Sequence, residues 1–174
     1  PPDRGRTFFI RDSRFLGNEE WNFLLYKKTK RNNLELMKNI AIIGSGPAGI
    51  FSTLLLEKFD GKILLFDQNK RIGEKLRITG GGRMNVTNRI FSADEFSSES
   101  SRLLKNLFKS PWVKNREEIL QSLGIEYVWE KNRAILKSGD ANAEVERLAE
   151  KIFRQKNASF YPNALVENIE KKEE

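Results

Sequence analysis

The chain has 174 residues, with 31 Lys and Arg against 24 Asp and Glu, a formal net charge of +7, and neither cysteine nor histidine. These counts exclude a disulfide framework, a thiolate metal site and histidine-based acid or base catalysis. The 39% of hydrophobic residues is too high for a wholly disordered chain, and the length suits one domain of ordinary size. Because the basic residues are scattered, we interpret them as solvated surface and do not expect a nucleic-acid partner.

Residues 1–36 differ from the rest of the chain, because their aromatic and charged residues follow no sustained period of 2 or 3.6. They contain no continuous apolar signal segment, so we expect a cytoplasmic protein. Met37 is followed at once by a strand-like run. We therefore expect Met37 to be the native start, with 1–36 an extension and 37–174 the dinucleotide-binding part. The alternative is a helical arm around 19–28, "EEWNFLLYKK".

A strand, a helix and a second strand are expected at the start of this second part. The apolar β-branched run 40–43 predicts a buried strand, 48–59 an amphipathic helix, and 62–66 the next strand, with Asp67 at its end. This order in about 28 residues has the size of a βαβ unit, whose strands are parallel. Glycines and a proline interrupt the uncharged run 39–56, so we do not expect a membrane span.

The rest of the chain predicts a helical excursion, a hairpin and a return to the sheet. Apolar periodicity indicates helices over 94–108 and from Pro111 to Leu123, and alternation indicates a hairpin of 125–129 with 133–137. Asp140 can cap a long helix, after which 158–162 reads as the third parallel strand and 164–174 as the start of another. The buried stripe expected for that long helix is Val145, Leu148, Ile152 and Phe153.

The first chemical motif is a G-x-G-x-x-G turn between the first strand and the first helix. Asp67 follows 23 positions after Gly44, close to the spacing of about 20 expected in dinucleotide-binding folds. The three glycines would allow a tight turn, an approach to a pyrophosphate and close packing of helix on strand, and Asp67 would accept hydrogen bonds from ribose. The motif consists of Gly44, Ser45, Gly46, Pro47, Ala48 and Gly49.

A second glycine cluster lies in "KLRITGGGRMNVTN", residues 75–88. Gly80–Gly82 give room and backbone N–H groups, Arg83 a charged donor, and Asn85 a neutral one. A dinucleotide-binding domain for NAD alone has little use for such a cluster so soon after the acid. We therefore favour FAD, a bulkier dinucleotide that needs a second close approach of the backbone.

Three stretches together carry a family resemblance. "IAIIGSGPAGIFS", the strand ending in "FDQN", and above all "IGEKLRITGGGRMNVTN" resemble the BaiN-like (YhiN-like) family of NAD(P)/FAD-dependent oxidoreductases. The later stretch "SLGIEYVWEKNRAILKSGDANAEVERL" agrees with the same family. The resemblance covers about residues 38–174. Met84 departs from the family pattern, which commonly has cysteine at this place.

The resemblance implies an α/β fold, a Rossmann-like FAD-binding domain of the glutathione-reductase-like type. It implies an FAD-dependent enzyme that oxidises or reduces a small-molecule substrate, with NAD(P)H as hydride donor. It also implies that this chain is an N-terminal fragment, inactive alone, because family members are more than twice as long. No catalytic acid or base and no metal ligand can be named. Beyond the first turn and Asp67, the cofactor-binding residues implied are Gln68, Lys75, Gly81, Gly82, Arg83, Asn85 and, through its backbone, Val166.

Three alternatives stay open at the level of sequence. The chain could be an NAD-dependent dehydrogenase domain, an FAD-dependent protein that modifies tRNA, or a fragment without catalysis. A bound flavin would oppose the NAD-dependent dehydrogenase domain and the fragment without catalysis, and would favour the FAD-dependent oxidoreductase. The second requires RNA binding that weakens steeply with salt.

Overall fold

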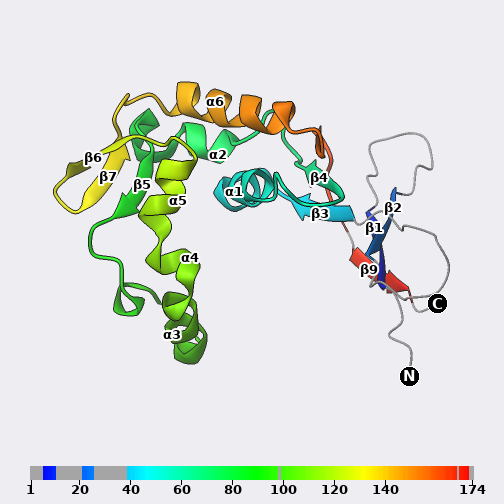
Figure 1. Ribbon diagram of the computed structural model, residues 1–174, viewed down its shortest axis with the longest axis horizontal. Helices are drawn as coiled ribbons and strands as arrows, with labels where there is room; N and C mark the ends of the chain where they lie inside the picture. The colour runs from blue at the N-terminus through cyan, green and yellow to red at the C-terminus, as the bar shows by residue number, and fades with distance from the viewer. Residues whose placement is uncertain (1–5, 11–20, 26–38, 98, 168, 173–174) are drawn as a thin grey trace. The chain divides into compact units, whose positions relative to one another are not determined.

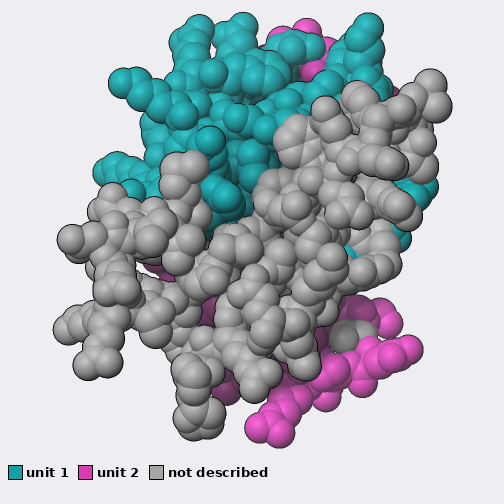
Figure 2. Space-filling model, turned by 90° about the vertical axis from the view of Figure 1, so that its right-hand side faces the viewer, with its two compact units in different colours: residues 1–75, 145–174 teal, residues 76–144 magenta. Residues whose placement is uncertain are grey.

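A computed structural model of the chain describes residues 6–10, 21–25, 39–97, 99–167 and 169–172. The chain divides into two compact units, residues 1–75 with 145–174 and residues 76–144, which Figure 2 colours separately. Among the described residues, the first unit contains a parallel sheet and an antiparallel sheet, and the second unit contains one antiparallel sheet.

The parallel sheet of the first unit confirms the predicted α/β Rossmann-like fold. Its strand order is β3-β4-β8, with β3 at Asn39–Ile43, β4 at Lys62–Phe66 and β8 at Ala158–Tyr161. Both neighbours of β4 run parallel to it, and helix α1 (Pro47–Leu55) connects β3 to β4 (Figure 1). The first three predicted elements and the third parallel strand therefore form in the expected order, although α1 is shorter than predicted.

Strand β4 is the centre of this sheet and is buried on both faces. Ile63 and Leu65 point to one face and are fully buried, while Leu64 and Phe66 alternate to the other. Burial on both faces is typical of a parallel strand covered on each side. The predicted strand 40–43 is less buried than expected, and Ile43 at its end is 49% exposed. Among the described strands of this parallel sheet, β3 lies at the edge and pairs with β4 on one side.

Helix α6 (Ala141–Arg154) precedes β8 and is capped as predicted, since the N–H of Ala143 donates to the Asp140 carboxylate at 3.0 Å. Its stripe of Val145, Leu148 and Ile152 is buried. The prediction for Phe153 was wrong, because this side chain is 61% exposed. One position beyond Ile152, it lies about 100° further around the helix.

Helix α1 ends at Leu55, earlier than the predicted end near residue 59. The amide of Asn157, in the turn before β8, donates to the carbonyls of Leu56, Glu57 and Phe59 at 3.1 to 3.3 Å. Gln155 donates to the carbonyls of Thr53 and Leu54. These side chains satisfy carbonyl groups that a continued helix would bind, and residues 56–58 form a turn.

The second unit is built on the sheet β5-β7-β6. Strands β6 (Tyr127–Glu130) and β7 (Arg133–Leu136) form the predicted hairpin, with Lys131 at φ +56° in the turn. Strand β5 (Asn85–Asn88) pairs with β7, which the sequence analysis did not predict. The short helix α2 (Glu74–Arg77) and the 3-10 turn η1 (Thr79–Gly82) lead from the first unit into this sheet.

The helices of the excursion are shorter than predicted. The expected helix 94–108 divides into the 3-10 turn η2 (Ala93–Glu95) and α3 (Ser101–Lys109), because Phe96 is extended and Ser100 caps a new helix through the N–H of Leu103. The helix expected from Pro111 to Leu123 divides at Asn115, which leaves helical geometry at φ −97° and ψ 21°. The resulting helices are α4 (Pro111–Lys114) and α5 (Arg116–Ser122).

The antiparallel sheet of the first unit has the order β2-β1-β9, with β1 at Arg6–Ile10, β2 at Trp21–Leu25 and β9 at Ile169–Lys172. The alternative of a helical arm around 19–28 is wrong for 21–25, which form a strand, and its other residues lie outside the described part. A strand was expected in 164–174, and β9 forms there. That residues 1–36 are an extension stays a prediction, as does the position of the native start.

Candidate functional site

The turn between β3 and α1 contains three glycines, and each has a different structural environment. Gly44 has φ +92°, which favours glycine, and its N–H donates to the carbonyl of Phe66 at 2.7 Å. A Cβ at Gly46 would meet nothing within 4 Å, so open space lies before this backbone. A Cβ at Gly49 would lie 1.9 Å from the carbonyl oxygen of Gly44. These environments agree with the predicted turn, ligand approach and close packing.

The N-terminus of α1 begins directly at this turn and carries no negative side chain. Gly46 is the residue before the helix, and Pro47 is its first residue, where a missing N–H costs nothing. No acidic residue lies in the first turn, and no side chain caps it. The helix dipole and the unpaired N–H groups at this end therefore favour an anion such as a phosphate group.

The carboxylate of Asp67, at the end of β4, lies beside the glycine turn and is nearly buried. Its Oδ2 accepts hydrogen bonds from the N–H of Ser45 at 2.6 Å and from the Ser45 hydroxyl at 2.5 Å. Its Oδ1 accepts from the N–H and the side-chain amide of Asn69, at 2.7 and 2.9 Å. Burial alone would raise the pKa of Asp67, but these hydrogen bonds outweigh burial and hold it below the ordinary value.

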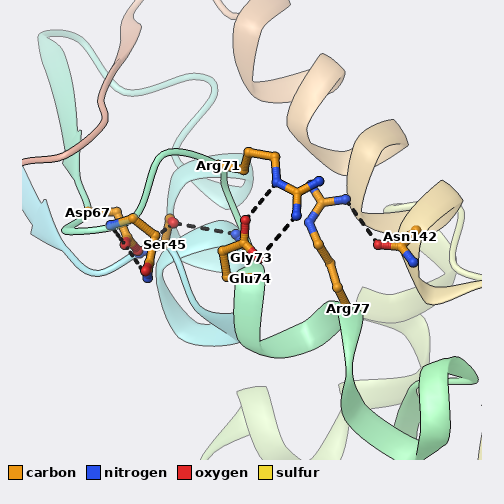
Figure 3. Close-up of polar contacts among 8 residues, drawn as sticks. Ser45, Asp67, Arg71, Gly73, Glu74, Arg77 and Asn142 are labelled. Atoms are coloured by element: carbon orange, nitrogen blue, oxygen red, sulfur yellow. Dashed lines mark hydrogen bonds and ion pairs between the residues drawn. The ribbon is translucent and has the colours of Figure 1, made fainter.

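Ser45 also connects the turn to the segment that leads into the second unit (Figure 3). The N–H of Gly73 donates to the carbonyl of Ser45 at 3.0 Å and lies 3.4 Å from its hydroxyl oxygen. Gly73 has φ +72°, and a Cβ there would lie 2.7 Å from Val145 Cγ1 and 3.2 Å from Ile50 Cδ1. Three segments of the first unit therefore meet at one buried serine.

In the second unit, the glycine cluster is a left-handed turn. Gly80, Gly81 and Gly82 have φ of +58°, +66° and +85°, and the N–H of Met84 closes the turn on the carbonyl of Thr79 at 3.0 Å. A Cβ at Gly81 or Gly82 would meet nothing within 4 Å. Met84 is buried and itself has φ +54°, unusual for a residue with a side chain. The predicted room for a close approach is therefore present at 81 and 82.

The polar residues around this cluster differ in what they already contact. Arg83, predicted as a charged donor, is half-exposed and forms an ion pair with Glu130 of β6 at 3.0 Å. Asn85 lies next to Gly80, whose Cβ would be 3.1 Å from the Asn85 Oδ1. Lys75 is exposed on α2. An exposed ion pair is weak, so the Glu130 contact leaves Arg83 able to bind an anion instead.

The predicted residues thus lie in both units. The structure brings Gly44–Gly49 and Asp67 together in the first unit, with Gln68 exposed next to Asp67. Val166 packs on the sheet face formed by Leu64 and Phe66. Gly81, Gly82, Arg83 and Asn85 belong to the second unit, and Lys75 is the last residue of the first unit before it.

Asn69 was not predicted, although the sequence contains a signal for it. An Asp whose side chain accepts from the N–H two residues later forms an Asx turn, and "DQN" provides such a spacing. In the described part of the chain, no group of three or more carboxylates, histidines or cysteines could hold a metal ion. Nor does any described helix have the length and apolar character needed to cross a membrane.

Comparisons with known proteins place these features in context. Residues 38–174 match the family described as HI0933-like protein Rossmann domain. The 3-dehydro-bile acid delta(4,6)-reductase of Clostridium scindens is 29% identical over 135 residues, which cover 76% of this chain and 33% of that protein. The ribosomal RNA dihydrouridine synthase of Haemophilus influenzae is 35% identical over 65 residues, covering 37% of this chain and 16% of that protein.

The Escherichia coli ribosomal RNA dihydrouridine synthase matches with the same identity and coverage. Among solved structures, the chain resembles THI4 of Thermovibrio ammonificans at 17% identity and a TM-score of 0.47, covering 71% of this chain and 38% of that one. The chain spans about a third of the length of the bile acid reductase and less of the RNA synthases.

Proposed function

The chain belongs to the HI0933-like Rossmann-domain family, and on that premise we propose that it binds FAD as the dinucleotide-binding part of an oxidoreductase. Membership agrees with the BaiN-like resemblance of its motifs. The observation that carries the proposal is the glycine turn. Gly46 faces open space at a helix N-terminus without a side-chain cap, which leaves room for a ligand. Gly49 packs directly against the backbone of Gly44.

FAD, when bound, supplies the electron and hydride transfer, while the chain binds and orients it. The turn and the start of α1 would hold the pyrophosphate, and Asp67 would hold the ribose. The open backbone at Gly81 and Gly82, with Arg83, would make the second approach. The residues proposed to contact FAD are Gly44, Ser45, Gly46, Pro47, Ala48, Gly49, Asp67, Gln68, Lys75, Gly81, Gly82, Arg83, Asn85 and Val166.

For the whole protein, we propose hydride transfer from NAD(P)H to a small-molecule substrate in the cytoplasm. The support is the bile acid reductase, whose match covers most of this chain. The chain spans about a third of that relative, so for the chain itself we propose FAD binding alone. We name no catalytic acid or base, since this proposal rests on binding residues alone.

A second candidate is an enzyme that acts on RNA. The two dihydrouridine synthases favour it at 35% identity over 65 residues, and the net charge of +7 is compatible with a polyanion. We rank it below the first because these matches cover 37% of the chain. RNA binding that falls steeply between low and moderate salt would favour it; binding that is absent at low salt would oppose it.

The experiment for FAD is direct. The purified chain is incubated with excess FAD, passed through gel filtration, and its absorption recorded between about 300 and 500 nm. A parallel sample receives NAD, which does not absorb in this range and is therefore released from the protein peak by denaturation and quantified by chromatography. Flavin bands that travel with the protein support the proposal, because the turn then retains FAD. A protein peak that stays colourless at every FAD concentration refutes it, and retention of NAD alone would indicate a dehydrogenase domain.

A further inference from the structure

The two oxygens of the Asp67 carboxylate have different surroundings. Oδ2 faces inward, toward the N–H and hydroxyl of Ser45, a residue that is fully buried. Oδ1 accepts from Asn69, which is exposed. One oxygen is therefore held by a buried residue and the other by the backbone and side chain of an exposed residue.

The carboxylate has no acceptor position left over. An ionised carboxylate offers about four lone-pair sites, and four donor groups of Ser45 and Asn69 occupy them. A ribose hydroxyl can bind Asp67 only by displacing one of these donors. The two backbone N–H groups cannot leave without moving the chain, so the choice lies between the Ser45 hydroxyl and the Asn69 side-chain amide.

The Ser45 hydroxyl is the harder one to move. It lies in the buried junction where the N–H of Gly73 meets the carbonyl and hydroxyl of Ser45 (Figure 3). The backbone of Asn69 is also fixed, because its carbonyl accepts from the N–H of Asn163 at 3.1 Å. Its exposed side chain, by contrast, can rotate into water without disturbing the backbone.

We infer, resting on the proposed FAD function, that Ser45 and Asn69 have opposite parts in ribose recognition. Ser45 is a positioning residue that fixes Oδ2 of Asp67. The Asn69 side-chain amide occupies the place of a ribose hydroxyl on Oδ1 and is displaced when the dinucleotide binds. The Asn69 amide thus lowers the affinity of every ligand that must displace it, FAD included.

The test measures FAD affinity by fluorescence titration in single variants. Asn69→Ala removes the amide that must be displaced, so the dissociation constant of FAD should fall by about two- to tenfold. Ser45→Ala removes a hydrogen bond that fixes Oδ2 of Asp67, so the dissociation constant of FAD should rise by about tenfold or more. The matched controls are Asn106→Ala, exposed in α3, and Ser52→Ala, exposed in α1; both should bind FAD like the wild type.

A measurement without ligand separates positioning from general stability. The carboxyl carbon of Asp67 is titrated by NMR in the ligand-free chain, and Ser45→Ala should raise the pKa of Asp67 while Ser52→Ala leaves it unchanged. Ser45→Cys, which keeps a weak donor on a somewhat larger side chain, should give an intermediate FAD affinity and an intermediate Asp67 pKa. It replaces Ser45→Ala if that variant does not fold.

Weaker FAD binding by Asn69→Ala would overturn the proposal that ribose displaces the Asn69 amide, because the amide would then help to bind FAD. An unchanged FAD affinity and an unchanged Asp67 titration in Ser45→Ala overturn the positioning. If the wild type binds no FAD, the proposed function and the ribose part of the inference both fail. The ligand-free titration still decides whether Ser45 fixes Oδ2.

Discussion

Replacing Gly49 with alanine should destabilise the domain through the packing of α1 on the glycine turn. The new Cβ would lie 1.9 Å from the Gly44 carbonyl oxygen, whereas ordinary contacts begin at 3.4 Å, so the two must separate by about 1.5 Å. The obstacle is backbone, and the N–H of Ser45 in the same peptide unit donates to Asp67 Oδ2 at 2.6 Å, so this unit cannot rotate aside freely. The helix cannot withdraw freely either, because Ile50 and Thr53 are fully buried.

The expected cost follows from two opposing terms. Overpacking a core costs about 1–3 kcal/mol, and contact with a backbone oxygen belongs at the upper end of that range or above. Alanine is the better helix former by about 1 kcal/mol, which offsets part of it. We therefore expect the free energy of unfolding to fall by about 2 kcal/mol, which is about 4–8 °C in the melting temperature of a domain of this size.

Gly46→Ala is the matched control, since it adds the same methyl group three positions earlier. Gly46 has φ −71° and ψ −170°, which alanine adopts readily, and its Cβ would meet nothing within 4 Å. Its stability should change by less than about 0.5 kcal/mol, but its FAD affinity should drop because the methyl group enters the proposed pyrophosphate space. Urea unfolding of both variants and FAD titration of Gly46→Ala provide the measurements. Wild-type stability in Gly49→Ala would refute the packing argument, and wild-type affinity in Gly46→Ala the pyrophosphate position.

Three further predictions concern other parts of the chain. Gly81→Val puts a β-branched residue at φ +66° and should abolish FAD retention with little change in far-UV circular dichroism; Gly139→Val, at φ +67° and in equally open space, should keep FAD, and equal loss in both would point to backbone strain alone. Asn157→Ala removes the amide that binds the carbonyls after α1 and should lower the free energy of unfolding by about 1–3 kcal/mol in urea; an unchanged midpoint and slope would contradict this. The pKa of Asp67 lies below its ordinary 3.8, because its hydrogen bonds outweigh its burial, so the ionised form stabilises the fold above that pH and loses this contribution as the pH falls through the lowered pKa. The difference in unfolding free energy between wild type and Asp67→Asn should therefore stay constant down to about pH 5 and shrink in more acid solution; a difference that grows on acidification would reverse the sign of the shift.

The elements that the sequence predicted best are those with a strong local pattern. The run at 40–43, the glycine turn and the strand at 62–66 were readable because apolar runs and glycines specify them locally, and the structure confirms them. The hairpin of β6 and β7 was readable by alternation. The family resemblance, carried by the same motifs, is confirmed over residues 38–174.

What the sequence could not predict depends on distant partners. Strand β5 follows three left-handed glycines and becomes a strand only by pairing with β7, almost fifty residues later. Helix α1 ends early because Asn157 binds the carbonyls after it, from about a hundred residues away. The individual binding residues stay predictions. That Ser45 and Asn69 occupy the Asp67 carboxylate follows only from the three-dimensional structure.

The bonds between Asn157 and the end of α1 constrain the order in which this chain can fold. They join residues separated by 98 to 101 positions, and strand β8 pairs with β4 over a similar distance. During synthesis, the β3-α1-β4 segment emerges before residues 76–144. Its third strand and the Asn157 side chain that binds the end of its helix emerge only after them. Such non-local closure slows folding, so we expect the early segment to stay incomplete on the ribosome until about residue 161 has emerged.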